Sequence, residues 1–339
     1  MTSRDWTAEA VAALRSHVDG VAPVRALPSP YFTVDIRAVD ESGFPAGIKY
    51  RAVRDLFAHD VVSGLIGEGT SLVEASGSAT ALAAAHFART LKLPLTIVLP
   101  ARTAPAQIAR LEAYGAVCRP AERPAAMYEE ARVFAAETGA HYLDFLGRAV
   151  DAVDWRGNGL AVALAADAPQ WIVVGVGSGV TSTTVARHLR HVGDRTTRVA
   201  VVDAENSAYF PGWASGVADY GTGMPSRIPG IGRPRMESGF LGSLVDLVIP
   251  VPDGASVAAM RWCHEVSGVA VGPSTGANLW GVWELAKVMR RDGVRGMITT
   301  VFADAGDQYA DTFHDPAWVD GRGFEVEPYA ERIAGLYAH

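Results

Sequence analysis

The sequence predicts an α/β protein with two lobes, each built on a mostly parallel sheet that is flanked by helices. Two series of alternating strand-like and helix-like segments carry this prediction, the first over residues 71–138 and the second from about residue 155 onward. Strands and helices that alternate at this spacing form parallel sheets. A chain of 339 residues is also long enough for two domains with separate cores.

The first series follows an irregular lead-in that contains several prolines. A predicted strand over residues 31–37 and a predicted helix over residues 52–62 also precede it. The predicted strands of the series cover residues 71–74 and 95–99, and its predicted helices cover residues 81–91, 106–114 and 125–138. Gly115 and Gly139 follow two of these helices, where glycine commonly ends a helix.

The second series contains the apolar run 171–175, which is typical of a strand buried on both faces of a parallel sheet. Its other predicted strands cover residues 198–203, 247–250 and 297–302, and its helices cover residues 160–166, 181–191 and two stretches between 250 and 297. Residues 204–238 form a long irregular segment rich in Gly, Pro and Arg. Such a length exceeds a simple connection and indicates a functional or interfacial role.

Composition limits the classes of partner. A net charge of −7 and a pI near 5.7 argue against a nucleic-acid or anionic-membrane partner. No apolar run reaches the ~20 residues that span a bilayer, and residues 1–20 predict a short amphipathic helix rather than a signal peptide. We therefore expect a cytoplasmic protein. Cys118 and Cys263 have no metal-like spacing and are expected to be buried thiols, so no metal site is predicted.

Lys49 is one of only three lysines among 30 basic residues. Arginine stays protonated, whereas a desolvated lysine can lose its proton and form a Schiff base with an aldehyde. An ordinary surface lysine in a loop is the alternative. The helical stretch that follows places Lys49 at or just before the start of a helix.

A glycine-rich loop, residues 175–181, lies between a predicted buried strand and a helix. Backbone N–H groups in such a turn can bind an anion, and glycines let a phosphate approach the main chain. A dinucleotide is an alternative ligand because Asp203 ends the next strand, but Val180 replaces the third glycine of that motif. A tight strand-to-helix turn without a ligand is a further alternative. Hydroxyl groups that would suit a phosphate monoester are those of Ser178, Thr181, Ser182 and Thr183.

A second strand-to-helix loop, residues 76–80, offers hydroxyl groups and the free N–H groups of a helix start. Such a loop can hold a carboxylate, although a capped helix without a ligand has the same pattern. Ser274 opens a third helix in the same way. A scarce lysine, a phosphate loop and a carboxylate loop together indicate a pyridoxal phosphate enzyme that acts on an amino acid.

Five further segments are long, specific and occur in order: residues 154–158 (DWRGN), 202–207 (VDAENS), 226–235 (SRIPGIGRPR), 272–276 (GPSTG) and 304–309 (DAGDQY). With them, the chain resembles over most of its length the fold-type II pyridoxal phosphate enzymes of the cysteine synthase class, in particular their actinobacterial cysteine desulfhydrase branch. The resemblance implies a two-domain, tryptophan synthase beta-like fold. It places residues 48–150 in a smaller domain with the substrate-carboxylate loop, and residues 1–47 plus 151–339 in a larger domain that binds the cofactor phosphate.

The resemblance also implies residue roles. Lys49 would carry the internal aldimine and move the α-proton, and Ser274 would hydrogen-bond the pyridine nitrogen. The remaining cofactor-binding positions would be Gly177, Ser178, Gly179, Val180, Thr181 and Ala79, and the substrate-binding positions would be Ser76, Gly77, Ser78, Thr80 and Phe145. A homodimer is the family's usual assembly.

The chain departs from the family pattern near the site. Gly47 stands where the family usually has a serine two residues before the lysine. Ala79 falls on an asparagine that reaches the cofactor's phenolic oxygen, or Ser78 does if the alignment moves by one residue. Phe145 falls on a glutamine at the substrate carboxylate, and Val180 falls on the second glycine of a pair.

The resulting hypothesis is a lyase that eliminates the β-substituent of L-cysteine or a related β-substituted alanine, giving pyruvate, ammonia and, from cysteine, sulfide. A β-replacing synthase is the alternative within the family. A nicotinamide-dependent dehydrogenase that uses the glycine loop and Asp203, or a binding protein without activity, are alternatives from other classes.

Overall fold

A computed structural model describes residues 3–16, 22–123 and 126–338. The chain divides into two compact units, unit 1 with residues 1–21 and 49–154 and unit 2 with residues 22–48 and 155–339. This grouping differs from the expected one at the amino terminus. Helix α1 (Ser3–Ser16) packs against α2 (Lys49–Val62) of unit 1, whereas we expected residues 1–47 to belong entirely to the larger domain.

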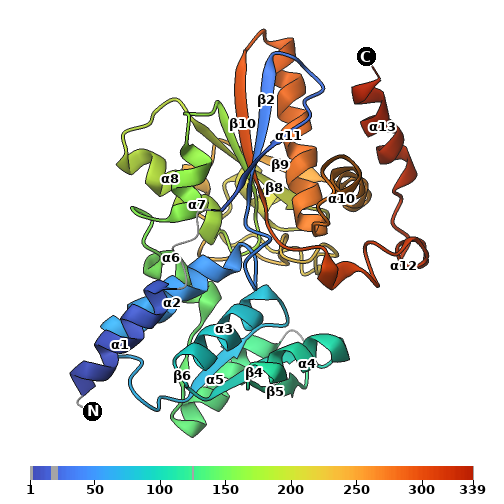
Figure 1. The fold of residues 1–339 in the computed structure, drawn as a ribbon. Helices are drawn as coiled ribbons and strands as arrows, with labels where there is room; N and C mark the ends of the chain where they lie inside the picture. Colours follow the sequence, from blue (N-terminus) through green and yellow to red (C-terminus); the bar gives the residue numbers. More distant parts are fainter. Residues whose placement is uncertain (1–2, 17–21, 124–125, 339) are drawn as a thin grey trace. The chain divides into compact units, whose positions relative to one another are not determined.

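Unit 2 contains a six-stranded sheet in the order β1-β2-β10-β7-β8-β9, parallel throughout except for the antiparallel edge strand β1. Its strands are β1 (Val24–Leu27), β2 (Val34–Asp40), β7 (Trp171–Gly175), β8 (Arg198–Ala204), β9 (Leu247–Val251) and β10 (Gly296–Phe302). Its helices are α7 (Gly159–Ala165), α8 (Val180–His191), α9 (Tyr209–Ser215), α10 (Asp253–Ser267), α11 (Pro273–Arg291), α12 (Pro316–Gly321) and α13 (Glu327–Tyr337). Two short 3-10 helices cover Gly242–Leu244 and Asp307–Tyr309. In Figure 1, α11 runs beside β2 and β10.

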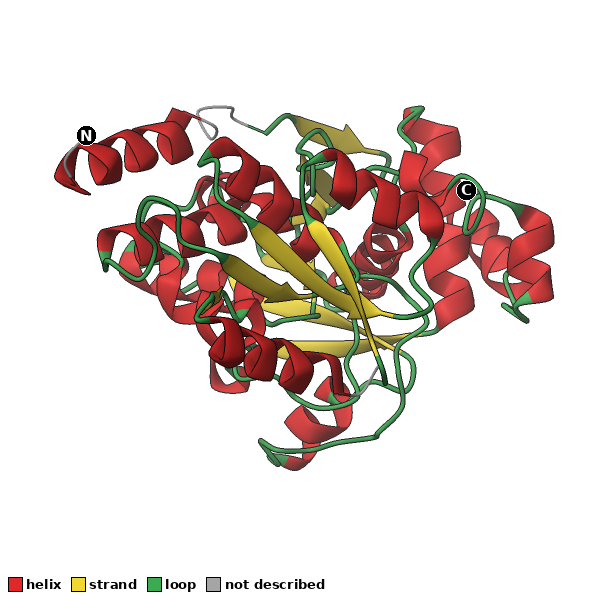
Figure 2. Ribbon diagram, turned by 90° about the horizontal axis from the view of Figure 1, so that it is seen from below, coloured by secondary structure: helices red, strands yellow, loops and turns green. Residues whose placement is uncertain are grey.

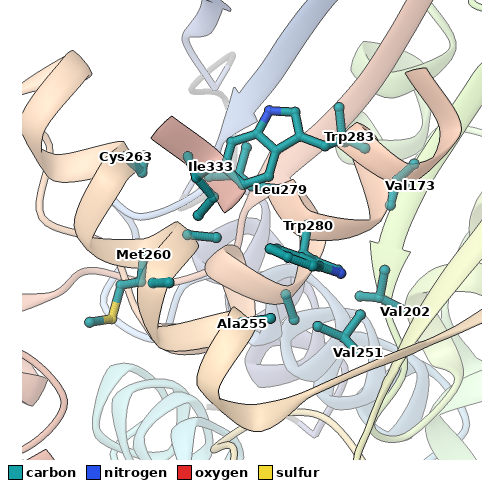
Figure 3. Close-up of a cluster of buried hydrophobic side chains, with 14 of the residues drawn as sticks. Val173, Val202, Val251, Ala255, Met260, Cys263, Leu279, Trp280, Trp283 and Ile333 are labelled. Atoms are coloured by element: carbon teal, nitrogen blue, oxygen red, sulfur yellow. The ribbon is translucent and has the colours of Figure 1, made fainter. Parts of the chain in front are cut away.

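Successive residues of β7 alternate between two apolar cores, as the period of a strand requires. Ile172 and Val174 belong to a core with α7 and α8, whereas Val173 belongs to a core with α10, α11 and α13. Figure 3 shows the second core around Trp280 and Trp283 of α11. The carboxyl ends of these buried strands are thereby held rigidly.

Unit 1 contains a four-stranded parallel sheet in the order β5-β4-β3-β6. Its strands are β3 (Leu72–Ala75), β4 (Leu95–Pro100), β5 (Val117–Ala121) and β6 (His141–Tyr142). Besides α1 and α2, its helices are α3 (Ala79–Thr90), α4 (Pro105–Ala113), α5 (Met127–Thr138) and α6 (Phe145–Ala152). Figure 2 colours the strands yellow and the helices red.

The predicted alternation of parallel strands and helices is confirmed in both units. The sequence did not indicate β1, β5, β6, α6, α12 or α13, and the irregular segment 204–238 contains the short helix α9. Within the described residues, no helix is both long and apolar enough to span a bilayer.

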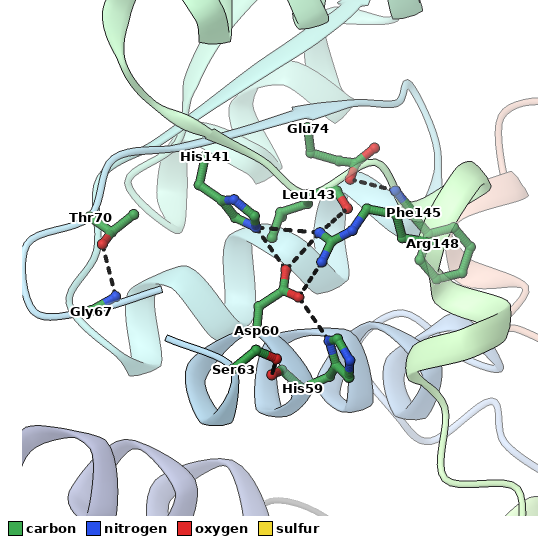
Figure 4. Close-up of polar contacts among 10 residues, drawn as sticks. All are labelled: His59, Asp60, Ser63, Gly67, Thr70, Glu74, His141, Leu143, Phe145 and Arg148. Atoms are coloured by element: carbon green, nitrogen blue, oxygen red, sulfur yellow. Dashed lines mark hydrogen bonds and ion pairs between the residues drawn. The ribbon is translucent and has the colours of Figure 1, made fainter. Parts of the chain in front are cut away.

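The buried carboxylate of Asp60 joins three elements of unit 1 (Figure 4). Asp60 of α2 is fully buried and accepts hydrogen bonds from Arg148 of α6, with Nη1–Oδ2 at 2.8 Å and Nη2–Oδ1 at 2.5 Å. His141 of β6 lies 2.7 Å from Oδ2, and His59 lies 3.1 Å from Oδ1. Burial raises the pKa of this carboxyl group, but the hydrogen bonds from His141, Arg148 and His59 outweigh burial and bring the pKa to about 2.

We expect Asp60→Ala to reduce the free energy of unfolding by roughly 3 kcal/mol at pH 7, because it leaves a partly buried arginine without its partner. Urea denaturation followed by circular dichroism measures this change. Glu129→Gln is the control, because Glu129 forms an exposed pair with Arg132 on the surface of the same unit and should leave stability unchanged.

The contribution of Asp60 should also depend on pH in a defined direction. Its folded pKa lies below the ordinary value of 3.8, so the stabilisation is present above about pH 4 and is lost as the pH falls through 2. The stability difference between wild type and Asp60→Ala should therefore shrink over this window. An undiminished difference at pH 2 would contradict the assigned interactions.

Candidate active site

Lys49 is the first residue of α2, as the sequence predicted, and it directly follows an anchored segment of unit 2. The Ile48 N–H donates to the Ala303 carbonyl oxygen at 2.7 Å, one residue after β10 ends. Gly47 has a φ of +53°, and a β-carbon there would lie 2.0 Å from the same oxygen. The close approach therefore requires glycine at position 47.

Phe145, the first residue of α6, faces Lys49 within unit 1. The centre of its ring lies 5.9 Å from Lys49 Nζ, and the side chain is only 2% exposed. The ring face stabilises positive charge on the nitrogen, whereas the start of α2 contributes the positive end of a helix dipole and disfavours it. The residue before Phe145, Asp144, has a φ of +47° and caps α6 by accepting the Gly147 N–H at 3.2 Å.

Glu74 is a second buried carboxyl group of unit 1 and precedes the loop 76–80. Its Oε1 accepts the Ala75 N–H at 2.9 Å, and its Oε2 accepts the Phe145 N–H at 3.2 Å. Burial is the main reason why its pKa is raised to about 8, and repulsion by Asp144 adds to the effect. Glu74 could not be predicted from sequence as a site residue, because a lone glutamate in a strand has no motif around it.

The loop 76–80 joins β3 to α3. Ser76 Oγ accepts the Ser78 N–H at 3.1 Å, and Ser78 occupies the N-cap position without a capping hydrogen bond from its side chain. Within the described chain, no acceptor is recorded for the backbone N–H groups of Ala79 and Thr80. Gly77 packs against Pro100, where a β-carbon would come within 2.8 Å of Cδ. The loop thus presents unpaired donors that could hold a carboxylate.

The glycine-rich loop of unit 2 joins β7 to α8. In the described residues, no acceptor is recorded for the backbone N–H groups of Gly177, Ser178, Gly179, Thr181 and Ser182. Buried backbone donors without acceptors are rare in native proteins, and a run of them at a helix start forms an anion site. The loop therefore offers the unpaired donors that an anion such as a phosphate group would require.

Two glycines of this loop are required by its packing. A β-carbon on Gly177 would lie 2.1 Å from the Gly230 carbonyl oxygen, and one on Gly179, with φ +79°, would lie 2.3 Å from the Phe240 nitrogen. Val180 begins α8 as a buried residue. The valine thus occupies the first helical position and leaves the N–H groups of the loop unchanged.

The hydroxyl groups of the loop have different partners. Ser182 Oγ donates to the Gly179 carbonyl oxygen at 3.0 Å, and Thr183 Oγ1 donates to Gly239 at 2.8 Å. Ser178 Oγ is 3.4 Å from the Val180 nitrogen. Of the described hydroxyl groups here, that of Thr181 has no recorded partner, so Ser178 and Thr181 suit a bound anion better than the other two.

Ser274 lies in the first turn of α11, in the same unit. Its Oγ donates to Asp304 Oδ1 at 3.3 Å, and Tyr309 donates to Asp304 Oδ2 at 2.5 Å. A β-carbon on Gly230 would lie 3.8 Å from Ser274 Cβ, so the Gly230 backbone lies beside both Ser274 and Gly177. Asp304 belongs to the family segment 304–309, for which sequence indicates no role, and the structure places it at Ser274.

The predicted site residues thus form two groups. Unit 1 contains Lys49, the loop 76–80 and Phe145, and unit 2 contains the loop 177–181 and Ser274.

A family model described as "Pyridoxal-phosphate dependent enzyme" matches residues 19–301, most of the chain. The chain belongs to the pyridoxal-phosphate dependent enzyme family. The chain is also 41% identical to L-cysteine desulfhydrase Cds1 of Mycobacterium tuberculosis, a match that covers 95% of this chain and 92% of the relative. It is 30% identical to N-(2-amino-2-carboxyethyl)-L-glutamate synthase of Ralstonia nicotianae, over 81% of each protein.

Solved structures share the fold of this pyridoxal-phosphate dependent enzyme. Cysteine synthase of Entamoeba histolytica aligns with a TM-score of 0.80 at 18% identity, covering 96% of this chain and 95% of the other. O-acetylserine dependent cystathionine beta-synthase of Helicobacter pylori aligns with a TM-score of 0.76 at 20% identity, covering 88% and 97%. The expected fold class and cofactor are therefore confirmed.

The residues present fit pyridoxal phosphate. The unpaired N–H groups of the loop 177–182 match a phosphate dianion, and Lys49 supplies an amine for the aldehyde. The family match decides against the dehydrogenase alternative. Asp203, on which that alternative rested, is 1% exposed, and its Oδ2 accepts the Phe210 N–H at 2.8 Å.

Gly47→Ala should lower both the midpoint of thermal unfolding and the affinity for pyridoxal phosphate, because a β-carbon cannot fit against Ala303. Absorbance titration with the cofactor measures the affinity. Gly43→Ala is a control in the same segment, since a β-carbon at this exposed glycine meets no atom within 4 Å. Wild-type affinity and stability in Gly47→Ala would refute the packing argument.

The raised pKa of Glu74 predicts a stability change with pH. The folded protein retains a proton that the unfolded chain loses above its ordinary pKa of 4.5, so this group reduces stability as the pH rises from about 4.5 to 8. Glu74→Gln removes this titration. The free energy of unfolding of the variant, relative to that of wild type, should therefore rise between pH 5 and pH 8. A constant difference would show that Glu74 is ionised throughout.

Proposed function

We propose that this enzyme catalyses β-elimination from L-cysteine or a related β-substituted alanine. With cysteine and water, the products would be pyruvate, ammonia and hydrogen sulfide. The observation that carries the proposal is the 41% identity to a cysteine desulfhydrase over nearly the full length of both proteins. The residues support the proposal, because unit 1 contains a lysine at a helix start and a loop suited to a carboxylate, and unit 2 contains a loop suited to a phosphate group.

Bound pyridoxal phosphate would supply an electron sink for the carbanion at the substrate α-carbon. The amine of Lys49 would hold the cofactor and accept the α-proton. Backbone N–H groups of residues 177–182 and the Thr181 hydroxyl would bind the phosphate, and Ser274 would contact the pyridine nitrogen. The N–H groups of Ala79 and Thr80 would orient the substrate carboxylate.

A β-replacement synthase is the second candidate, and the Ralstonia nicotianae synthase favours it at 30% identity. The two candidates share proton removal and loss of the β-substituent, and they differ in whether a second nucleophile adds. Production of pyruvate without an added nucleophile supports elimination. Efficient formation of a new β-substituted amino acid supports replacement.

We further propose a cytoplasmic homodimer. The two free cysteines, of which Cys263 is buried, support a reducing compartment. The net charge of −7 supports small-molecule substrates rather than nucleic acid. Light scattering of the purified protein tests the dimer.

Lys49→Arg should remove the visible absorption of the lysine-bound cofactor and reduce pyruvate formation by at least roughly 10²-fold, because arginine cannot act as the amine. The matched controls are Lys92→Arg and Lys287→Arg, the same change at the other two lysines. These should retain both signals. Unchanged absorption and activity in Lys49→Arg would exclude Lys49 as the cofactor-bearing residue.

Substrate preference should reflect the departures at Ala79 and Phe145. A lost hydrogen bond to a charged group costs about 1.5–3 kcal/mol, so two such losses predict cysteine synthesis from O-acetylserine that is roughly 10²–10⁴-fold weaker than in an ordinary cysteine synthase. Larger or less polar β-substituents should react better. We would compare kcat/KM for cysteine, O-acetylserine, O-phosphoserine and larger β-substituted alanines.

The variants Ala79→Asn and Phe145→Gln test whether the two positions matter. Each should raise kcat/KM for O-acetylserine. Efficient use of O-acetylserine by wild type, with no change in either variant, would show that these departures have no role in specificity.

A further inference from the structure

We propose that Arg148 is a positioning residue for Lys49, because it holds the first turn of α6 against α2 and thereby keeps the Phe145 ring beside the lysine amine. The inference rests on the proposed function, since it concerns the lysine assigned to proton transfer. All residues involved belong to unit 1.

The first part of the argument is that α2 carries both Lys49 and the partner of Arg148. Asp60 follows Lys49 by eleven residues, which is close to three full turns, so both side chains lie on the same face of the helix. Helix α6 packs against α2. The Asp60 carboxylate accepts hydrogen bonds from both Nη atoms of Arg148 (Figure 4). This bidentate pair fixes the orientation of the guanidinium group as well as its distance from the carboxylate.

The second part is that two hydrogen bonds hold the segment leading into α6. The guanidinium group of Arg148 also donates to the Leu143 carbonyl oxygen at 3.1 Å, two residues before Phe145. Glu74 accepts the Phe145 N–H itself. Arg148 follows Phe145 by three residues, so it lies one turn further along the same helix. The backbone that carries the Phe145 ring is therefore held by contacts on both sides of it in the chain.

The third part concerns the consequence for Lys49. An aromatic face within about 6 Å of an ammonium group stabilises its charge, and a buried ring also restricts access of water and reagents to the nitrogen. The observed separation is 5.9 Å, near the limit of this interaction, so a small displacement of α6 would remove it. Arg148 thus controls how readily the Lys49 amine reacts, without contacting it.

A purely structural role for Arg148 makes a different prediction. Such a role would lower the stability of the protein but leave the reactivity of Lys49 in the folded state unchanged. The reactivity of the lysine, measured apart from turnover, therefore separates the two possibilities.

The experiment labels the full-length protein with an amine-reactive ester after hydroxylamine has removed the cofactor, at a fixed pH, and quantifies each lysine by mass spectrometry. Lys92 and Lys287 are internal standards in every sample. Phe145→Leu should raise the labelling of Lys49 roughly two- to fivefold relative to these standards. Arg148→Gln should give a similar increase, and the double variant should give no more than Phe145→Leu alone.

Arg54→Gln is the matched control. Arg54 is also on α2, but it pairs with Asp55 of its own helix, at 2.8 Å from Nε to Oδ1. This variant should leave the labelling of Lys49 unchanged. If Arg148→Gln does not fold, Arg148→Lys replaces it, because lysine keeps the charge with a single contact to Asp60. This variant should raise the labelling of Lys49 by a smaller factor, and it should cause no further increase when Phe145→Leu is also present.

Two outcomes overturn the inference. One is wild-type labelling of Lys49 in the folded Arg148 variants. The other is labelling in the double variant that equals the product of the increases in the two single variants. Failure of the proposed function has a separate signature, because it would appear as wild-type protein that neither binds pyridoxal phosphate nor forms pyruvate, whatever the labelling shows.

Discussion

The close approach of Gly47 to the end of β10 is the constraint on which the lysine depends. Ala303 contacts two segments at once: its carbonyl oxygen accepts the Ile48 N–H, and its N–H donates to Thr275 Oγ1 at 2.9 Å. The next residue, Asp304, accepts the hydroxyl proton of Ser274. One buried strand end therefore fixes both the residue before the lysine and the start of α11. A β-carbon at position 47 would disturb all of these contacts.

Unit 1 shows how environment, rather than residue type, sets the charge of a buried carboxyl group. Asp60 and Glu74 are both almost fully buried, yet the pKa of Asp60 is about 2 and that of Glu74 about 8. Asp60 receives an arginine and two histidines, whereas Glu74 receives two backbone N–H groups. The hydrogen bonds from Arg148 and the two imidazole rings therefore keep Asp60 ionised, and peptide donors alone do not compensate for the burial of Glu74.

Hydrophobic patterns in the sequence predicted the secondary structure that depends on neighbouring residues. The buried strands and the helices that follow them are continuous in sequence, and β7 was found at the predicted residues. Strand β5 was missed because it lies at a sheet edge, is mostly exposed and contains Pro120, which an edge strand tolerates. Helix α6 was missed because Asp144, the residue before it, has a left-handed backbone conformation that could not be predicted from sequence.

The residues of the candidate site also differ in whether sequence could indicate them. Lys49 and the two loops could be proposed from sequence because scarcity, glycines and hydroxyl groups mark them within a few residues. Asp60 could not be proposed, because its partners His141 and Arg148 are 81 and 88 residues away along the chain. The roles of Asp304 and Glu74 likewise depend on contacts that form only when distant segments fold together.

The departures from the family pattern should affect cofactor binding less than substrate choice, for a reason that the structure of the loops supplies. The unpaired donors of both loops are backbone N–H groups, which a change of side chain at Val180 or Ala79 does not remove. The cofactor phosphate can therefore be held despite these changes. The side-chain amides of the family pattern can form hydrogen bonds that a methyl group or a phenyl ring cannot form. We therefore expect substitution at positions 79 and 145 to alter the choice of amino acid more than the binding of the cofactor.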